Sequence, residues 1–369
     1  MAGKKADYQQ IKKQKTTAQI REVLRALPPL CGDYILSISS TTSALTRLAY
    51  AHDLRTFFYF LTLEEPAFAS IEPGAFSAED LARITLRNLE RYQDYLRQYV
   101  RPDYNGKRLF DEDSDDVRLT MNDEAAIARK LSAVRSFFKY LYTHEIIPEN
   151  VTEKLKMPKL HEKPIIYLDR DEVYRMLEAA ETGEGLGERQ KKYAENTRVR
   201  DLAILCLLVG TGIRASELIG MDLDDVDIER GAFAVTRKGG NRVILYFNDG
   251  VKEALADYLA RRNKIRAAEG HENALFLSLQ KKRISARALQ DLVKKYASAA
   301  APLKDRLSPH KLRSTFGTNL YRETGDIYLV ATSLGHSNVN TTRKHYAAAD
   351  EDKRRAAAAR VTWVDPKRK

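Results

Sequence analysis

A histidine and an arginine stand at a predicted helix start, in the segment SPHKLR at residues 308–313. Ser308 is a good N-cap and Pro309 a good first helical residue, so His310 should lie in the first turn. Arg313 follows three residues later and should share its face. The free N–H groups and the positive dipole end of a helix start favour a bound anion. The segment therefore predicts a phosphate site, with a capped helix carrying ordinary surface charges as the alternative.

A second arginine, Arg214, follows a nearly continuous apolar run and a break at Thr211-Gly212. A guanidinium this close to a core needs a partner, because burying an unpaired charge is costly. Glu217 lies three residues on, at a spacing that lets it orient the guanidinium. The pair is either an internal ion pair or a guanidinium held so that it grips a phosphate with two parallel hydrogen bonds.

More polar side chains follow towards the C-terminus. Gly335 should end one helix, which places His336 in a turn, and Tyr346 then lies early in the next helix. Taken singly, either residue is usually structural. A metal site at His310, His336 and His345 is not favoured, because no pair of them has the i, i+4 spacing of a helical zinc site.

The 369 residues carry 62 Lys plus Arg against 51 Asp plus Glu, a formal net charge of +11. Residues 1–25 contribute +5 and residues 353–369 contribute +6, so the excess lies at the two ends. This balance indicates a polyanionic partner, with nucleic acid first and an acidic membrane second.

The two cysteines, Cys31 and Cys206, lie far apart, which excludes a disulfide framework and a cysteine-based metal site. The sequence also gives no support for a Cys, Ser or Thr nucleophile triad. The lysines near the start have no apolar signal core behind them, and no apolar run approaches membrane-spanning length. We therefore expect a soluble, cytoplasmic protein.

The elements that must position these residues lie on either side of a break. Residues 156–164 hold two prolines and four charges, which is typical of an interdomain linker. Before it, apolar residues at helical spacing predict helices over residues 43–61, near 81–99 and over 127–141. The basic residues between these apolar positions are also compatible with an ordinary helix surface.

After the linker, residues 201–209 are nearly all apolar and predict a buried helix. Two short β runs, residues 232–236 and 242–247, flank Lys238-Gly239-Gly240-Asn241 and predict a hairpin. Residues 251–259 return to helical spacing. The predicted fold class is mainly α with a small antiparallel β-sheet.

Taken together, the sequence resembles the tyrosine recombinase (phage integrase) family of site-specific DNA recombinases, from about residue 35 to 350. The motifs that carry the resemblance occur in the family's order and at approximately its spacing: TGIRASEL around Arg214, Lys238 in the hairpin, PHKLR with His310 and Arg313, LGH with His336, and Tyr346 in the closing helix. The helical first half is also similar to the family's core-binding domain, down to LSAVRSFFKY at residues 131–140.

The resemblance implies that Tyr346 attacks a DNA phosphodiester, forms a 3′-phosphotyrosine bond and releases a 5′-hydroxyl. Arg214 and Arg313 would then hold the charge of the transition state, which is chemistry that a bidentate guanidinium suits. No metal, ATP or other cofactor is implied.

Proton transfer in this reaction needs further groups. His336 is expected to donate a hydrogen bond, His310 is a candidate base for the tyrosine proton, and Lys238 is a candidate acid for the leaving oxygen. Arg237 is a rival for the acid role, but its pKa is too high to release a proton readily. One departure from the family concerns Tyr346, which lies one residue further from His336 than is common and leaves His345 at the usual position.

The resemblance also implies a domain plan. We expect a basic N-terminal extension (1–30), an all-helical core-binding domain (31–155), a linker (156–166), a mixed α/β catalytic domain (167–349) and a basic tail (350–369) that contacts a neighbouring subunit. The implied partner is a double-stranded DNA recombination site.

On that site the chain should form a synaptic tetramer, and when free it should be a monomer or weak oligomer. An accessory DNA-bending protein is compatible with this plan, and a membrane is not part of it. Two alternatives stay open from the residues alone: a DNA-binding protein without covalent chemistry, and a type IB-like enzyme that relaxes DNA without strand exchange.

Overall fold

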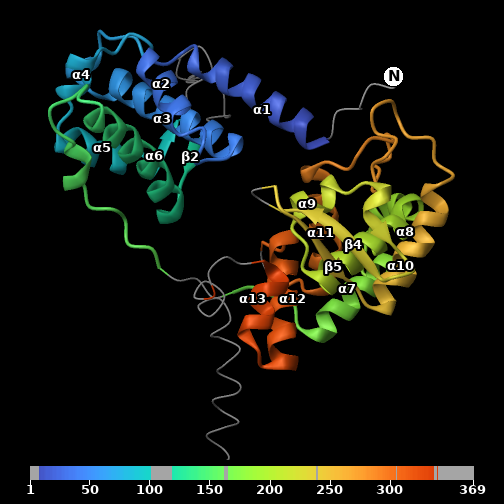
Figure 1. The fold of residues 1–369 in the computed structure, drawn as a ribbon. Coiled ribbons are helices and arrows are strands. Elements are labelled where there is room, and N and C mark those ends of the chain that lie inside the picture. Colours follow the sequence, from blue (N-terminus) through green and yellow to red (C-terminus); the bar gives the residue numbers. More distant parts are fainter. Residues whose placement is uncertain are drawn as a thin grey trace, which may run out of the picture. The chain divides into compact units, whose positions relative to one another are not determined.

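The computed structural model describes residues 8–100, 119–161, 165–237, 240–304, 306–335 and 339. These residues are mainly helical and form one two-stranded and one three-stranded antiparallel sheet, which confirms the predicted fold class. The chain divides into two units, Met1–Glu162 and Lys163–Lys369 (Figure 1). No helix in the described ranges combines the length and the apolar composition needed to cross a membrane.

The first unit is a helical bundle with one short antiparallel pair of strands. Its elements are α1 (Tyr8–Leu24), α2 (Pro29–Ser37), α3 (Ala44–Glu64), η1 (Pro66–Phe68), α4 (Ala78–Ala82), α5 (Leu86–Tyr95), β1 (Gln98–Val100), β2 (Leu119–Met121), α6 (Glu124–Thr143) and η2 (Val151–Lys154). The helices predicted over 43–61 and 127–141 are confirmed as α3 and α6. The single helix predicted near 81–99 is wrong, because Thr85 and Asn88 form a capping box that starts α5 anew.

Aromatic side chains fill the core between α3 and α6. Phe57, Phe58, Phe137 and Phe138 are fully buried, and their rings meet edge to face at centroid distances of 5.8–6.3 Å. The basic segment before residue 30 joins this core, since Ile20 of α1 is only 5% exposed. The first unit is thus organised around the packing of α1 and α6 on α3.

The second unit surrounds one long helix, α8, and contains a three-stranded sheet. Its elements are α7 (Arg170–Thr182), α8 (Glu188–Thr211), α9 (Ala215–Gly220), η3 (Leu223–Asp225), β3 (Val226–Asp227), β4 (Ala232–Thr236), β5 (Arg242–Tyr246), α10 (Asp249–Arg262), α11 (Ala286–Ala300), α12 (Pro309–Thr324) and α13 (Ile327–Leu334). The strand order is β3-β4-β5, and Thr236 of β4 lies opposite Arg242 of β5. The predicted hairpin and the predicted helix over 251–259 are therefore confirmed.

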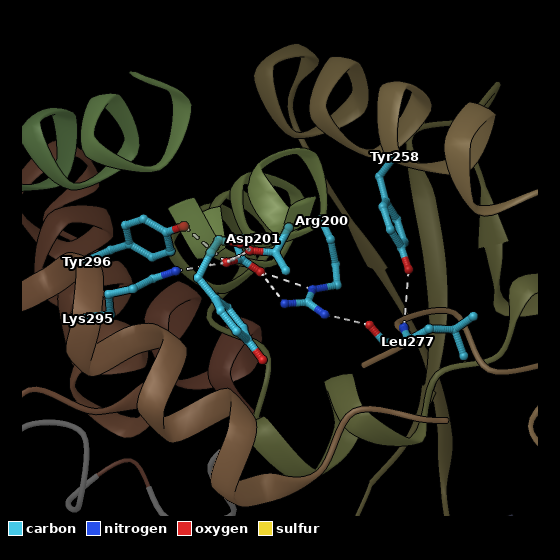
Figure 2. Close-up of polar contacts among 8 residues, drawn as sticks. Arg200, Asp201, Tyr258, Leu277, Lys295 and Tyr296 are labelled. Atoms are coloured by element: carbon cyan, nitrogen blue, oxygen red, sulfur yellow. Dashed lines mark hydrogen bonds and ion pairs between the residues drawn. The ribbon is translucent and has the colours of Figure 1, made fainter. Parts of the chain in front are cut away.

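A buried carboxylate fixes the middle of α8. Asp201 is only 1% exposed. Its carboxylate accepts from Thr197 at 2.8 Å. It also accepts from Arg200 at 2.7 Å, Tyr296 at 3.0 Å and Lys295 at 3.2 Å (Figure 2). Burial is the main cause that raises the pKa of Tyr296 and lowers the pKa of Lys295. The network joins α8 to α11, because Lys295 and Tyr296 both come from that helix.

The same network continues to a loop before α11. Arg200 donates to the carbonyl of Leu277 at 2.7 Å, and the main-chain N–H of Leu277 donates to the hydroxyl of Tyr258 in α10 at 3.2 Å (Figure 2). Three helices and one loop are thereby held by buried polar groups that satisfy one another.

We predict that Asp201→Ala lowers the free energy of unfolding by about 3 kcal/mol, because it leaves two partly buried cations without their buried anion. Denaturant unfolding followed by circular dichroism measures the change. Asp257→Ala is the matched control, since Asp257 is exposed on α10, and it should change stability by less than about 0.5 kcal/mol. A loss below about 1 kcal/mol for Asp201→Ala would contradict the importance of the network.

Candidate functional site

The structure describes three of the six residues that the sequence predicts as the site. Arg214, His310 and Arg313 belong to the described ranges, and all three lie in the second unit. The others lie outside the described residues: Lys238, His336 and Tyr346, together with His345.

Arg214 occupies the N-cap position of α9, where the carboxylate of Glu217 accepts two hydrogen bonds from it. The main-chain N–H of Arg214 donates to one carboxylate oxygen of Glu217 at 3.0 Å, and Nη1 donates to the other at 2.9 Å. Glu217 is 7% exposed. The predicted ion pair is therefore confirmed, although Arg214 stands just before the helix and not inside it. One carboxylate caps the helix and holds the guanidinium at the same time.

The guanidinium of Arg214 also reaches the end of a distant helix. Its Nη2 donates to the carbonyl of Gly335 at 3.1 Å, across 121 residues of sequence. Gly335 is the C-cap of α13, with a left-handed φ of 59°. Arg214 is thus placed by two contacts at once, one local and one from α13.

Arg313 is the most buried cation of the site, at 6% exposure. It lies in the first turns of α12, and its Nη1 donates to the carbonyl of Gly212, the C-cap of α8. Its Nη2 donates to the carbonyl of Leu334 in α13. A buried guanidinium needs such acceptors, and here the main chain at two helix ends supplies them.

The helix ends approach closely because both are capped by glycine. Gly212 has a φ of 62°, and a Cβ added there would overlap the ring of Phe316 in α12. Such a left-handed residue without a side chain is the usual way to end a helix. The ends of α8 and α13 therefore both contact α12 near Arg313.

His310 lies in the first turn of α12, as predicted, and its residue is exposed. Ser308 occupies the predicted N-cap position, but its side chain makes no capping hydrogen bond. Arg313, one turn later, points to α8 and α13 and is buried. The two residues therefore differ in exposure, with the imidazole at the surface and the guanidinium beneath it.

A third guanidinium, from Arg237, joins this cluster. Arg237 directly follows β4, and its Nη2 donates to the carbonyl of Ser333 in α13 at 3.2 Å. From the sequence, Arg237 was considered only as an alternative to Lys238 for the role of general acid. Its distance in sequence from α13 left no signal that the two would meet, because every residue carries a carbonyl and none marks an acceptor in advance.

The cluster has an excess of positive charge. Arg214, Arg237 and Arg313 converge on the last turn of α13, and in the described part of the chain Glu217 pairs with one of them. The negative end of the α13 dipole offsets part of the repulsion among the three. The remaining charge favours an anion, and a phosphate suits the planar donor geometry of arginine.

Comparison with known families and proteins finds a consistent set of similarities. Residues 167–353 match the model of the Phage integrase family. The chain is 31% identical to Tyrosine recombinase XerC of Caldanaerobacter subterraneus subsp. tengcongensis, over 89% of this chain and 86% of that protein. It is 30% identical to Tyrosine recombinase XerS of Streptococcus thermophilus, over 94% and 99% of the two chains.

The fold of this chain is similar to those of solved recombinase and integrase structures. The XerH site-specific recombinase bound to its difH substrate matches with a TM-score of 0.58 and 20% identity, over 87% of this chain and 81% of that chain. The Tn1549 transposon integrase in complex with a circular intermediate DNA matches with a TM-score of 0.59 and 18% identity, over 90% and 99%.

We predict that Arg313→Lys lowers the free energy of unfolding by about 1–3 kcal/mol. A lysine has one ammonium group and cannot reach the carbonyls of Gly212 and Leu334 with the same geometry, so at least one buried acceptor is left unsatisfied. Denaturant unfolding measures the loss. Arg287→Lys on α11 is the control, because its side chain is 82% exposed, and equal effects of the two changes would refute the explanation.

Proposed function

The chain belongs to the phage integrase family and is a site-specific DNA recombinase, and from that premise we propose the residues and the step by which it cuts and rejoins DNA. Tyr346 is the nucleophile, and the intermediate is a covalent 3′-phosphotyrosine. Arg214 and Arg313 bind the scissile phosphate, with His310, His336 and Lys238 as the remaining groups of the site.

The observation that carries this proposal is the meeting of two arginines at the end of α13. Arg214 and Arg313 come from segments about 100 residues apart, yet they bond the successive carbonyls of Gly335 and Leu334. His336 is the next residue in the chain. The arrangement gathers two guanidinium groups beside the start of the segment that leads to Tyr346.

The proposed cleavage is an in-line displacement at phosphorus. The Tyr346 hydroxyl oxygen forms a bond to the phosphorus while the bond from phosphorus to the 5′ oxygen breaks. His310 takes the tyrosine proton, and Lys238 gives a proton to the leaving 5′ oxygen, so that a 5′-hydroxyl is released. Attack by the 5′-hydroxyl of the partner strand reverses these transfers and rejoins the DNA.

Charge stabilisation is the main contribution that the arginines make. Negative charge gathers on the non-bridging oxygens as the fifth bond forms, and pre-positioned guanidinium donors stabilise it without rearranging. Arg214 is well suited because Glu217 already fixes its plane. A partly buried site strengthens these interactions relative to water.

The proposal extends to the partners of the chain. We propose that it binds a double-stranded recombination site, assembles there as a tetramer and is a monomer or weak oligomer when free. It would act in the cytoplasm, and an accessory DNA-bending protein is compatible with this assembly. The net charge of +11 supports binding to a polyanion.

We predict that Tyr346→Phe abolishes a covalent protein–DNA band on a nicked duplex that carries the recombination site. The nick lets the cleaved fragment diffuse away, so the intermediate accumulates and is resolved by denaturing electrophoresis. Tyr328→Phe is the matched control, because Tyr328 is exposed at 69% on α13, and it should retain the band. His345→Ala should also retain it. A band that survives Tyr346→Phe and disappears with His345→Ala would assign the nucleophile to His345.

We predict that Arg214→Lys slows formation of the covalent band by about 100-fold or more, a loss typical of removing one transition-state donor. Lysine keeps the charge but loses the planar pair of donors that Glu217 orients. Single-turnover rates at saturating DNA measure the effect, and DNA affinity should change much less. An unchanged rate would exclude Arg214 from the phosphate site.

A further inference from the structure

The main chain of Arg237 closes the tip of the β4–β5 hairpin. Its N–H donates to the carbonyl of Asn241 at 2.8 Å, and its carbonyl accepts from the N–H of Gly240 at 3.0 Å. Arg237 is therefore fixed at the turn by hydrogen bonds in both directions. Lys238 is the next residue of the chain.

The side chain of Arg237 leaves the hairpin and reaches α13. Nη2 donates to the carbonyl of Ser333 at 3.2 Å, and the guanidinium lies against Gly335 so closely that a Cβ added there would overlap it. Gly335 therefore meets two requirements: a left-handed φ at the helix end and room for a side chain from the hairpin. The contact joins two segments that lie 96 residues apart.

Three arginines thus bond three successive carbonyls at one helix end. The guanidinium of Arg237 donates to the carbonyl of Ser333, that of Arg313 to the carbonyl of Leu334, and that of Arg214 to the carbonyl of Gly335. The last carbonyls of a helix receive no N–H donor from within the helix, so they can accept hydrogen bonds from other elements. Each arginine comes from a different element, and the end of α13 is their common anchor.

Within the described ranges, one donor of Arg237 has no acceptor. Its Nε is buried and has no hydrogen-bond partner among the described residues. A buried donor without an acceptor costs stability. A buried polar group of this kind calls for an explanation, and a role at the functional site is one such explanation.

We propose that Arg237 is a positioning residue that ties the hairpin tip bearing Lys238 to the end of α13 that precedes His336. The inference rests on the proposed function, because its effect on the reaction runs through Lys238 as the acid. Arg237 itself is not the proton donor in this proposal; it acts through Lys238. It holds the neighbouring residue where the leaving 5′ oxygen is protonated.

The contact of Arg237 with α13 has a measurable consequence, because proton transfer is sensitive to the distance between donor and acceptor. A displacement of about 1 Å in a reacting group can cost about 100-fold in rate. Arg237→Ala should therefore slow cleavage by about this factor while Tyr346, Arg214 and Arg313 stay intact. Arg237→Lys, which keeps a donor for Ser333, should recover part of the loss.

The decisive experiment compares two nicked duplexes, one natural and one with sulfur in place of the bridging 5′ oxygen at the scissile bond. In the second duplex the phosphorus–sulfur bond breaks and the thiolate leaves without a proton, because a thiol pKa of about 8.5 lies far below that of an alcohol. Arg237→Ala and Lys238→Ala should each lose about 100-fold on the natural duplex and less than about tenfold on the sulfur duplex. Arg214→Ala should stay slow on both.

A double variant tests whether the two residues act as a unit. Arg237→Ala should slow the Lys238→Ala protein by no more than about threefold on the natural duplex, because the acid to be positioned is already absent. Arg230→Ala, at an exposed turn before β4, is the control and should match the wild-type rate.

The outcomes separate the inference from the proposed function. Equal losses for Arg237→Ala on both duplexes, or no loss on either, would overturn the positioning role even though the Tyr346-dependent band still forms in the wild type. Absence of that band in the wild-type protein would instead overturn the proposed function. Thermal unfolding of Arg237→Ala close to that of the wild type excludes a general loss of fold.

Discussion

Burial of the Arg313 guanidinium is the constraint on which the described site depends. A cation at 6% exposure must give its N–H groups to acceptors, and the acceptors here are main-chain carbonyls of Gly212 and Leu334. Those carbonyls are available only because α8 and α13 end at these positions. The chain that continues from α8 leads to Arg214, and the chain that continues from α13 leads to His336. One buried side chain thus fixes the origin of two functional segments.

Main-chain carbonyls suit the positioning of phosphate-binding arginines better than carboxylates would. A carboxylate beside each arginine would neutralise the site and weaken its attraction for a phosphate. Carbonyls at a helix end carry only partial negative charge, so they hold the guanidinium groups in place while the site stays cationic. Among the described residues that contact the three arginines, Glu217 is the exception: it is 7% exposed and orients the Arg214 guanidinium from one edge. The hydrogen bonds therefore position the guanidinium groups without neutralising them.

Local patterns in the sequence predicted the elements well and the assembled contacts poorly. The hairpin, the long apolar helix and the end of α13 at Gly335 follow from short-range rules of periodicity and capping, and the Arg214–Glu217 pair follows from i, i+3 spacing. The predicted helix near 81–99 failed because a capping box outweighed its apolar spacing. The contacts of Arg313 and Arg237 with carbonyls could not be predicted, since acceptors common to every residue leave no pattern at separations of 21 to 101 residues.

The length of α8 connects the polar network of Asp201 to the site. Gly212 lies eleven residues after Asp201, which on a helix is a separation of about 16 Å. Asp201 bonds side chains of α11, so it fixes both the rotation of α8 and its position along its axis. The carbonyl of Gly212 can accept from Arg313 only at one rotation and one axial position of α8, because a shift by one residue turns a helix by about 100°. The buried network therefore does more than stabilise the second unit: it fixes where the end of α8 at Gly212 lies relative to α11, and with it the position of Arg214.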